Sequence, residues 1–120
     1  MDKSYRVAVA SSDGIVVNQH FGHAEIFYIY TITADDIEKE RTVRHMKAVC
    51  RLGDHDDKQL EKNMQKLQDC KYLLVSRIGN GAAIQAEKLG ITPMELPGLI
   101  TESLERLISY TQIQNLLERN

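Results

Sequence analysis

Three segments of the chain are apolar on both faces, which is typical of strands buried between two layers. They are residues 5–11, 25–33 and 72–76. Apolar residues recur three and four positions apart in three other segments, and this spacing predicts helices. These are residues 53–68, 82–89 and 101–118.

Two shorter apolar segments, residues 15–17 and 91–96, predict two further strands. Asp13 and Gly14 precede the first, and this pair favours a tight hairpin because glycine adopts a positive φ readily. We therefore expect residues 15–17 to pair antiparallel with the first strand. Pro93 interrupts the second segment and cannot donate a backbone hydrogen bond, so that strand is expected at a sheet edge.

Helix ends are indicated by polar residues that suit the helix dipole or a cap. Aspartates crowd the start of residues 53–68, where the positive end of the dipole favours them (Asp54, Asp56 and Asp57). Thr101 is expected to cap the last helix. Its expected inward positions are Leu104, Leu107, Ile108, Thr111, Ile113, Leu116 and Leu117. Residues 34–51 are polar and weakly periodic, so we expect a loop with at most a short strand near 42–44.

The order of these elements favours a mixed sheet with helices on both faces. A length of 120 residues fits one domain, residues 1–120. In open α/β sheets, ligands bind at the carboxyl ends of the strands, where loops lead into helices. Polar or metal-binding side chains in such loops are therefore the first candidates for a site.

Composition narrows the function classes further. The net charge is −2 and the basic residues are scattered, so bulk electrostatics favour no nucleic-acid partner. No apolar stretch is long enough to span a bilayer, and the first residues lack a signal-peptide core. We therefore expect a cytoplasmic protein without a membrane partner. Only Cys50 and Cys70 are present, which excludes an iron–sulfur or zinc site built from cysteines alone.

The most concentrated coordinating chemistry is the segment from Asn18 to His23, in which His20 and His23 flank Gly22. Neutral imidazole is the commonest metal ligand and suits iron, zinc and copper. A turn at Gly22 would bring both rings to one side. The alternative is structural, with both histidines as ordinary loop residues and Phe21 as a core anchor.

We expect different environments for the two cysteines. Cys50 falls in a polar segment expected to be exposed, where a thiol can ligate soft metals or be incidental. Cys70 precedes a buried strand and is expected in the core, because a free cysteine behaves as a small hydrophobe. His45 and His55 are isolated and expected to be solvated, although His45 is close enough in sequence to share a role with Cys50.

Gly79, Asn80 and Gly81 form a different kind of candidate site. They precede a predicted helix, so their backbone N–H groups are suited to an anion. The turn is not a P-loop, because the sequence GxxxxGK[ST] is absent. It is not a dinucleotide-binding motif either, because GxGxxG would need a third glycine at position 84, which is Ile84. Ordinary turn chemistry is the alternative. No combination of nucleophile, base and acid can be assembled, so we expect no catalytic residues and a protein that is not an enzyme.

The chain resembles the dinitrogenase iron–molybdenum cofactor biosynthesis family, whose members include NifX and the carboxy-terminal domain of NifB. The resemblance rests on residues 5–11, on Asp13-Gly14, and on the Asn-Gln-His-Phe-Gly-His segment at residues 18–23. Weaker agreement is found at Asp69-Cys70, at Arg77-Ile78-Gly79 and around Gly90. It covers approximately residues 5–95.

This resemblance implies a three-layer α/β/α fold with a mixed, about five-stranded sheet of ribonuclease-H-like topology. It also implies transient binding of an iron–sulfur or iron–molybdenum-type cluster or its precursor, with none expected after purification in air. Candidate metal ligands are His20, His23 and Cys50, and Gly79, Asn80 and Gly81 would contact the cluster's sulfides. Cofactor-assembly or nitrogenase-type proteins are the expected partners, and a homodimer is one way to complete an open site. The radical synthase activity of NifB is not implied, because its CxxxCxxC motif is absent.

Two other readings remain open from the sequence. The domain could be a docking module of a cofactor-assembly system that binds no cluster. A small hydrolase or nucleotide-binding enzyme using the Gly79 turn is the third reading.

Overall fold

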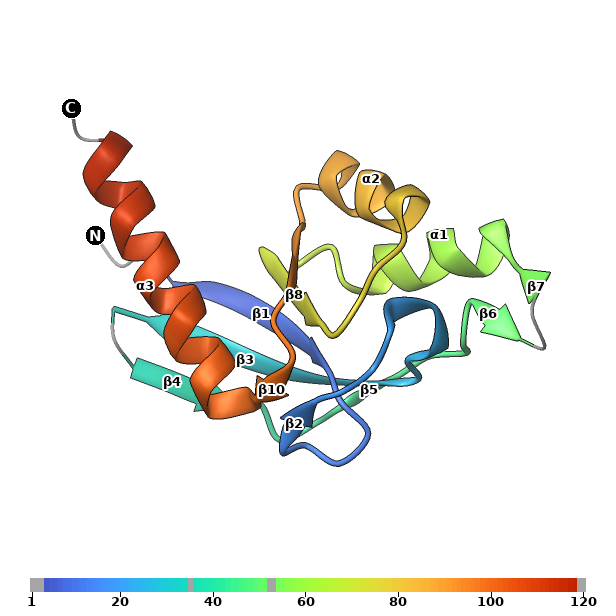
Figure 1. Cartoon of the computed structure of the whole chain (residues 1–120), viewed down its shortest axis with the longest axis horizontal. Helices are drawn as coiled ribbons and strands as arrows, with labels where there is room; N and C mark the ends of the chain where they lie inside the picture. The colour runs from blue at the N-terminus through green and yellow to red at the C-terminus, as the bar shows by residue number, and fades with distance from the viewer. Residues whose placement is uncertain (1–3, 35, 52–53, 119–120) are drawn as a thin grey trace.

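The computed structural model describes residues 4–34, 36–51 and 54–118, and the side chains of 51, 54 and 55 are not described. A central mixed sheet has the strand order β4-β3-β1-β8-β9 (Figure 1). Its strands are β1 (Tyr5–Ala10), β3 (Ile26–Thr33), β4 (Asp36–Lys39), β8 (Tyr72–Val75) and β9 (Thr92–Glu95). A further short strand, β5 (Arg44–His45), pairs with the start of β3. Strand β1 is antiparallel to β3 and parallel to β8, and β8 is parallel to β9.

Helices cover both faces of this sheet. Helices α1 (Asp57–Lys66) and α2 (Asn80–Lys88) lie on one face, and α3 (Ile100–Glu118) lies on the other. The alternation of side chains along β1 explains how one strand serves two layers. Ala8 and Ala10 belong to the core under α1 and α2, whereas Val7 and Val9 belong to the core under α3. The expected three-layer α/β fold with a mixed sheet is confirmed.

The expected hairpin at Asp13 is wrong. Strand β2 (Val16–Val17) pairs antiparallel with β10 (Gly98–Leu99) and not with β1. The Asp13 carboxylate accepts the N–H groups of Ile15 and Val16, at 2.9 and 3.1 Å. This local side-chain cap turns the chain away from β1 before a two-residue hairpin can form.

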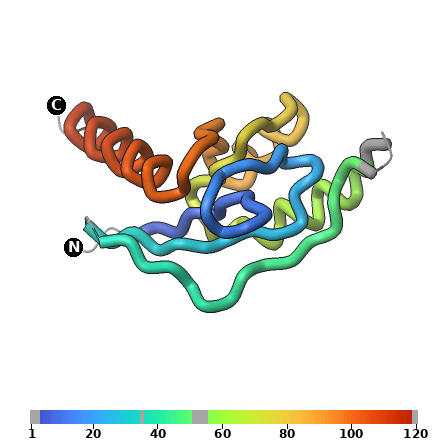
Figure 2. Tube along the Cα trace, turned by 60° about the horizontal axis from the view of Figure 1, so that its bottom comes forward, coloured from blue at the N-terminus to red at the C-terminus, as the bar shows by residue number. Residues whose placement is uncertain are grey.

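Residues 34–51 are more regular than the sequence indicated. They contain β4 and β5 and end in β6 (Cys50–Arg51), which pairs with β7 (Asp54–His55). The expected strand near 42–44 lies at Arg44–His45 instead. After β4 the chain runs along the outside of β3 as a strap, residues 40–51, and pairs with β3 at β5 (Figure 2). Strand β4 escapes detection because its side chains are exposed and largely charged, so only backbone pairing with β3 reveals it.

The helix boundaries shift for local reasons. Helix α1 begins at Asp57 and not at residue 53, because the Asp56 carboxylate caps it by accepting the N–H groups of Lys58 and Gln59. Residue 53 lies outside the described residues. Helix α2 begins two residues earlier than expected, directly after Gly79. Thr101 is the second residue of α3 and not its cap.

The outer half of α3 also differs from expectation. Ile113, Leu116 and Leu117 were expected inward, yet 57%, 62% and 65% of their surfaces are exposed. The C-terminal half of α3 extends away from the sheet (Figures 1 and 2). Helical spacing identifies apolar positions, but it cannot reveal that the opposing surface ends partway along the helix. Within the described part of the chain, no helix is long and apolar enough to cross a membrane.

Candidate functional site

Phe21 anchors the histidine segment to the molecule. Its side chain is only 1% exposed and packs against Phe27, with ring centroids 5.9 Å apart. Residues Phe21–His23 form a short 3₁₀ turn, and His20 precedes it in an extended conformation. The burial of Phe21 confirms the expected core anchor and leaves both neighbouring histidines exposed.

The histidine segment is held alongside the end of β8. The Ser76 N–H donates to the Gln19 carbonyl oxygen at 3.0 Å, and the Phe21 N–H donates to the Arg77 carbonyl oxygen at 2.8 Å. His20 therefore forms a parallel bridge with Arg77. These bonds bring the histidine segment and the turn before α2 to the same edge of the sheet, the edge where α/β proteins bind ligands.

His20 and His23 lie near each other on the exposed side of the turn. Their ring centroids are 6.2 Å apart and their planes are inclined by 47°. Imidazole nitrogens bind zinc at about 2.0–2.1 Å, so rings at this separation can meet one bound group from neighbouring directions. Neither ring is buried, so the surrounding residues do not fix the two imidazoles in one orientation. We therefore describe them as two separate contacts and not as a rigid chelate.

Cys50 reaches the same turn from the strap. A methyl group at Gly22 would lie 2.7 Å from the Cys50 Sγ, so the thiol occupies the space that glycine leaves open. Cys50 is half-buried in β6 and packs against the core under α1 and α2. The expectation of an exposed loop cysteine is therefore wrong, since strand pairing with β7 and contact with Gly22 hold the residue in place.

The three side chains do not form an assembled metal centre. Among the residues that the structure describes, no group of three or more His, Cys, Asp or Glu is arranged to hold a metal ion. His20, His23 and Cys50 are neighbours around one glycine, and two of the three are open to solvent. This arrangement can contact a bound group from one side without enclosing it.

The turn before α2 presents an open helix N-terminus. Gly79 is the N-cap of α2, and its position carries no side-chain cap. Apart from the adjoining residues of the chain and the backbone of α2, no described atom lies within 4 Å of where a Cβ would stand at Gly79 or Gly81. Backbone N–H groups at such an end attract anions through the helix dipole.

Glu95 is a neighbour of this turn that the sequence did not indicate. Its Oε2 accepts the Ile78 N–H at 3.0 Å from the last position of β9. The carboxylate therefore holds the turn in place and puts a negative charge beside the helix N-terminus. It escapes notice in the sequence because only the parallel pairing of β8 and β9 brings residues 78 and 95 together.

Ser76 is a second feature found only in the structure. Its Oγ is buried and has no hydrogen-bond partner within the described residues, although its backbone N–H bonds to Gln19. It lies at the point where β8 leads into the turn. Buried hydroxyls are usually paired, so the Ser76 Oγ is a polar atom at this edge that no protein group of the described residues satisfies.

The remaining candidates lie at other positions in the fold. Cys70 is 2% exposed, and burial raises the pKa of its thiol to about 12, which confirms the expected core role. His45 is exposed in β5. The side chain of His55 lies outside the described residues, so its expected solvation stays a prediction. Of the aspartates at the start of α1, Asp56 is the helix cap.

The comparisons with known proteins all indicate the same family. The sequence profile of the family described as "Dinitrogenase iron-molybdenum cofactor" matches residues 3–110. The FeMo cofactor biosynthesis protein NifB of Frankia alni is 36% identical over 104 residues, which cover 84% of this chain and 20% of that protein. Protein NifY of Klebsiella pneumoniae is 30% identical over 88 residues, covering 73% of this chain and 36% of that protein. The chain thus spans about a fifth to a third of these curated relatives.

Solved structures share the fold. The crystal structure of PH0822 superimposes with a TM-score of 0.62 at 22% identity, covering 87% of this chain and 90% of that one. An NMR structure of a Thermotoga protein provisionally named NifB gives a TM-score of 0.56 at 22% identity, covering 86% of each chain. Because the family profile covers most of the sequence and the expected three-layer fold is present, the chain belongs to the dinitrogenase iron–molybdenum cofactor family.

Proposed function

We propose that this chain is a non-enzymatic carrier that transiently binds an iron–sulfur cluster, in some cases containing molybdenum, during cofactor biosynthesis. The observation that carries the proposal is the convergence of two imidazoles and one thiol around Gly22, beside the uncapped N-terminus of α2. These are ligand types that iron and molybdenum–sulfur clusters accept.

The histidine segment and the glycine turn would contact different atoms of one bound cluster. His20, His23 and Cys50 would contact the metal atoms. The backbone N–H groups around Gly79, Asn80 and Gly81 would face the sulfides, which carry negative charge in such clusters. Arg77 is exposed and comes just before the glycine turn in the chain, so its side chain adds a positive charge to this part of the surface. A site with few ligands and an open face favours release to an acceptor over permanent retention.

The names of the relatives support a role in cofactor biosynthesis. NifB is named for FeMo cofactor biosynthesis, and the chain covers 20% of the Frankia protein. Partners of this chain are therefore proposed to be a metallocluster and proteins of a cofactor-assembly or nitrogenase-type system. A homodimer is also proposed. We place this function in the cytoplasm, where cysteine thiols stay reduced.

A docking module that binds no cluster is the alternative function. It is favoured by the exposure of both histidines and by the absence, among the described residues, of a group of three or more metal ligands. In that case the same edge would contact a partner protein, and the native chain would take up no cluster.

Anaerobic cluster uptake separates the two functions. The full chain is mixed with an isolated iron–molybdenum cofactor precursor and passed through a desalting column, and visible absorption and iron are measured in the protein fraction. We expect co-elution with the native chain and reduced uptake in His20→Ala, His23→Ala and Cys50→Ala. His45→Ala is the matched control, because His45 is an exposed histidine whose strand β5 pairs with the start of β3 and not with the Gly22 turn.

Each outcome bears on one hypothesis. Full uptake by all three variants would overturn the proposed ligands. No uptake by the native chain would overturn the carrier function and support the docking module. Equal loss in His45→Ala and His20→Ala would show that uptake does not depend on this edge.

A further inference from the structure

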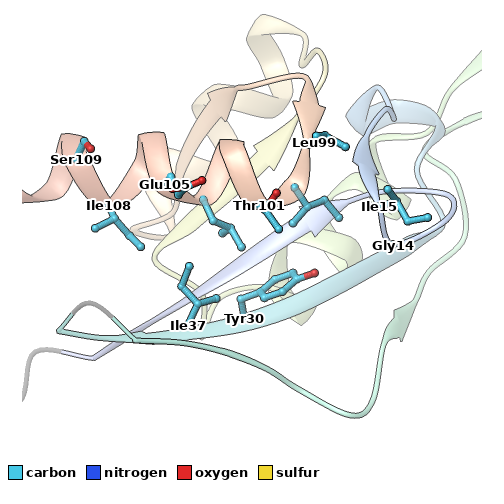
Figure 3. A pocket seen from close by; sticks show the side chains of 11 residues that line it. Gly14, Ile15, Tyr30, Ile37, Leu99, Thr101, Glu105, Ile108 and Ser109 are labelled. Atoms are coloured by element: carbon cyan, nitrogen blue, oxygen red, sulfur yellow. The ribbon is translucent and has the colours of Figure 1, made fainter.

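Two cavities are lined by residues other than the proposed cluster contacts. The larger, of about 780 Å³, is bounded by α3 on one side and by β3, β4 and the loop before β2 on the other (Figure 3). Its lining is mainly aliphatic and contains a single charged residue, Glu105. The smaller, of about 430 Å³, lies between α1 and the strap, and three lysines and a histidine line it. The lining of this smaller cavity, called the basic groove below, therefore carries a clear electrostatic pattern.

The basic groove is formed where the strap and α1 run antiparallel to each other. The Arg44 guanidinium donates to the Lys66 carbonyl oxygen at 2.8 Å, near the end of α1. Further along the strap, the Asp56 N–H donates to the Val49 carbonyl oxygen at 3.1 Å, at the start of α1. The lining residues between these two bonds are His45, Met46, Lys47, Gln59, Lys62 and Lys66.

A buried asparagine joins the two walls of the basic groove. Asn63 is 1% exposed, and its amide nitrogen donates to the Lys47 carbonyl oxygen at 2.8 Å. Its amide oxygen accepts from the Gln59 side chain, also at 2.8 Å. Because both amide groups of Asn63 are bonded, the wall from the strap and the wall from α1 are held together before any partner binds.

The lysines of the basic groove are not neutralised by the protein itself. Within the described part of the chain, Lys47, Lys62 and Lys66 are exposed and form no ion pair. Asp69 follows α1 closely, but its carboxylate oxygens are bonded to Arg44 at 2.6 and 2.8 Å. The net charge of the chain is −2, so these lysines gather in one groove against the overall sign of the molecule.

We propose that the basic groove docks an extended acidic segment of a partner protein. Lys62 and Lys66 are one helical turn apart, about 6 Å along the axis. Carboxylates on alternate residues of an extended segment repeat at about 6.6 Å, so successive acidic side chains can meet successive lysines. Lys47 adds a positive charge from the facing wall. Complementary charge of this kind directs a partner to one surface and speeds its association.

The basic groove lies close to the proposed cluster contacts but shares no residue with them. Lys47 is three residues before Cys50 on the strap. The Met46 N–H donates to the carbonyl oxygen of Glu25 at 2.9 Å, and Glu25 is two residues after His23. A partner docked in the basic groove would therefore lie beside the histidine segment, where a donor or acceptor of a cluster has to be. Docking and cluster binding can still be tested separately.

Fluorescence anisotropy with a labelled peptide of alternating glutamate and alanine tests the proposal on the full chain. The native chain should bind this peptide, and Lys62→Glu should raise the dissociation constant about threefold to tenfold. Lys62→Gln removes the charge without reversing it and should have a smaller effect. Lys88→Glu is the matched control, because it changes the net charge equally at an exposed position of α2, which packs against β9 and not against the strap.

The affinity for the peptide should fall as the salt concentration rises, because the lysines are exposed. The same peptide with glutamine in place of glutamate should not bind. Absence of binding by the native chain would overturn the proposal, and so would equal weakening by Lys62→Glu and Lys88→Glu, which would indicate a dependence on net charge alone. Displacement of the peptide by inorganic phosphate or single-stranded DNA at lower concentrations than by unlabelled peptide would also overturn it.

Cluster uptake distinguishes this inference from the proposed carrier function. Lys62 is outside the proposed cluster contacts, so Lys62→Glu should take up the cofactor precursor as the native chain does. Loss of peptide binding with unchanged uptake supports a separate docking surface. Equal loss of cluster uptake and peptide binding in Lys62→Glu would contradict it.

Discussion

The Cys50 Sγ lies against Gly22, at the place where any larger residue would put its Cβ. A methyl group there would lie 2.7 Å from the sulfur and 3.5 Å from the Cys50 Cβ. Residues separated by 28 positions are thus fitted together at the centre of the histidine segment. This contact is the physical link between the strap and the turn that carries His20 and His23.

Gly22→Ala is expected to displace the thiol. The new methyl group overlaps Sγ, and relief requires rotation of the Cys50 side chain or movement of the strap, at a cost of about 1–3 kcal/mol. Urea unfolding measures the free energy, and the rate of reaction with a disulfide reagent should increase because Sγ is pushed outward. Gly81→Ala is the control, since nothing lies within 4 Å of its Cβ position. An unchanged thiol reactivity in Gly22→Ala would contradict the close packing.

Cys70 is expected to resist alkylation in the folded protein. Burial, with the nearby Asp69 carboxylate, raises the pKa of its thiol to about 12. At mildly alkaline pH it is therefore neutral, and the neutral thiol is a poor nucleophile. Mass spectrometry after iodoacetamide treatment should find modification at Cys50 before Cys70, and equal labelling only in denaturant. Labelling of Cys70 at the rate of Cys50 under native conditions would show that the core is open.

Glu95→Gln is expected to strengthen anion binding at the α2 N-terminus. Glutamine can still accept the Ile78 N–H through its amide oxygen, but the negative charge beside the helix end is removed. Charges near a helix end contribute about 0.3–1 kcal/mol, so the dissociation constant for tetrathiomolybdate should fall about twofold to fivefold. Equilibrium dialysis with visible absorption measures it.

The control for Glu95→Gln removes a negative charge near the other end of α2. Glu87 is exposed near the C-terminal end of α2, so Glu87→Gln should change the affinity little. The effect of Glu95→Gln should shrink as salt screens the exposed carboxylate. Equal gains in both variants would indicate a dependence on net charge alone, which would contradict binding at the N-terminus.

Asp69→Asn is expected to remove a pH-dependent part of the stability. The Arg44 guanidinium bonds both carboxylate oxygens of Asp69, at 2.6 and 2.8 Å, and lowers the pKa of that carboxyl below its usual value of 3.8. A lowered folded-state pKa means that the stabilisation is present above pH 3.8 and is lost as the pH falls through the folded-state value. The pair is partly exposed, so its contribution is up to about 1 kcal/mol.

Urea unfolding of the native chain and Asp69→Asn across acidic and neutral pH checks this expectation. The difference in unfolding free energy should be largest near neutrality and should narrow below pH 3.8. Asp57→Asn serves as a comparison in the same unfolding measurements, because Asp57 is an aspartate in the first turn of α1. A difference that stays constant down to strongly acidic pH would contradict a role for the ionised Asp69.

Local patterns were sufficient for several parts of the molecule. The buried strands, the three helices and the core position of Cys70 are predictable because burial and secondary structure leave periodic apolar signals in neighbouring residues. The histidine segment and the glycine turn were also visible, since their residue types carry their chemistry. Their placement at one sheet edge follows from the bridge between His20 and Arg77.

The predictions from sequence were wrong where the structure of a residue depends on a partner far away in the chain. Strand β2 pairs with β10, about eighty residues later, and β4 is a strand only because β3 is beside it. Cys50 was expected to be exposed, because no residue near it in the sequence indicates that its side chain contacts Gly22. Likewise, Glu95 meets Ile78 only through the pairing of two parallel strands.

The layers, the donor groups of the His-Phe-Gly-His segment and the family could all be predicted from the amino-acid sequence. Only the folded chain shows which side chains lie together at the candidate site and which apolar residues of α3 stay exposed. Side-chain type and helical or strand period are local properties, and for that reason they are visible in the sequence. Contact between Cys50 and Gly22, or exposure of Leu116, depends on where the chain brings another surface, and that is a property of the whole fold.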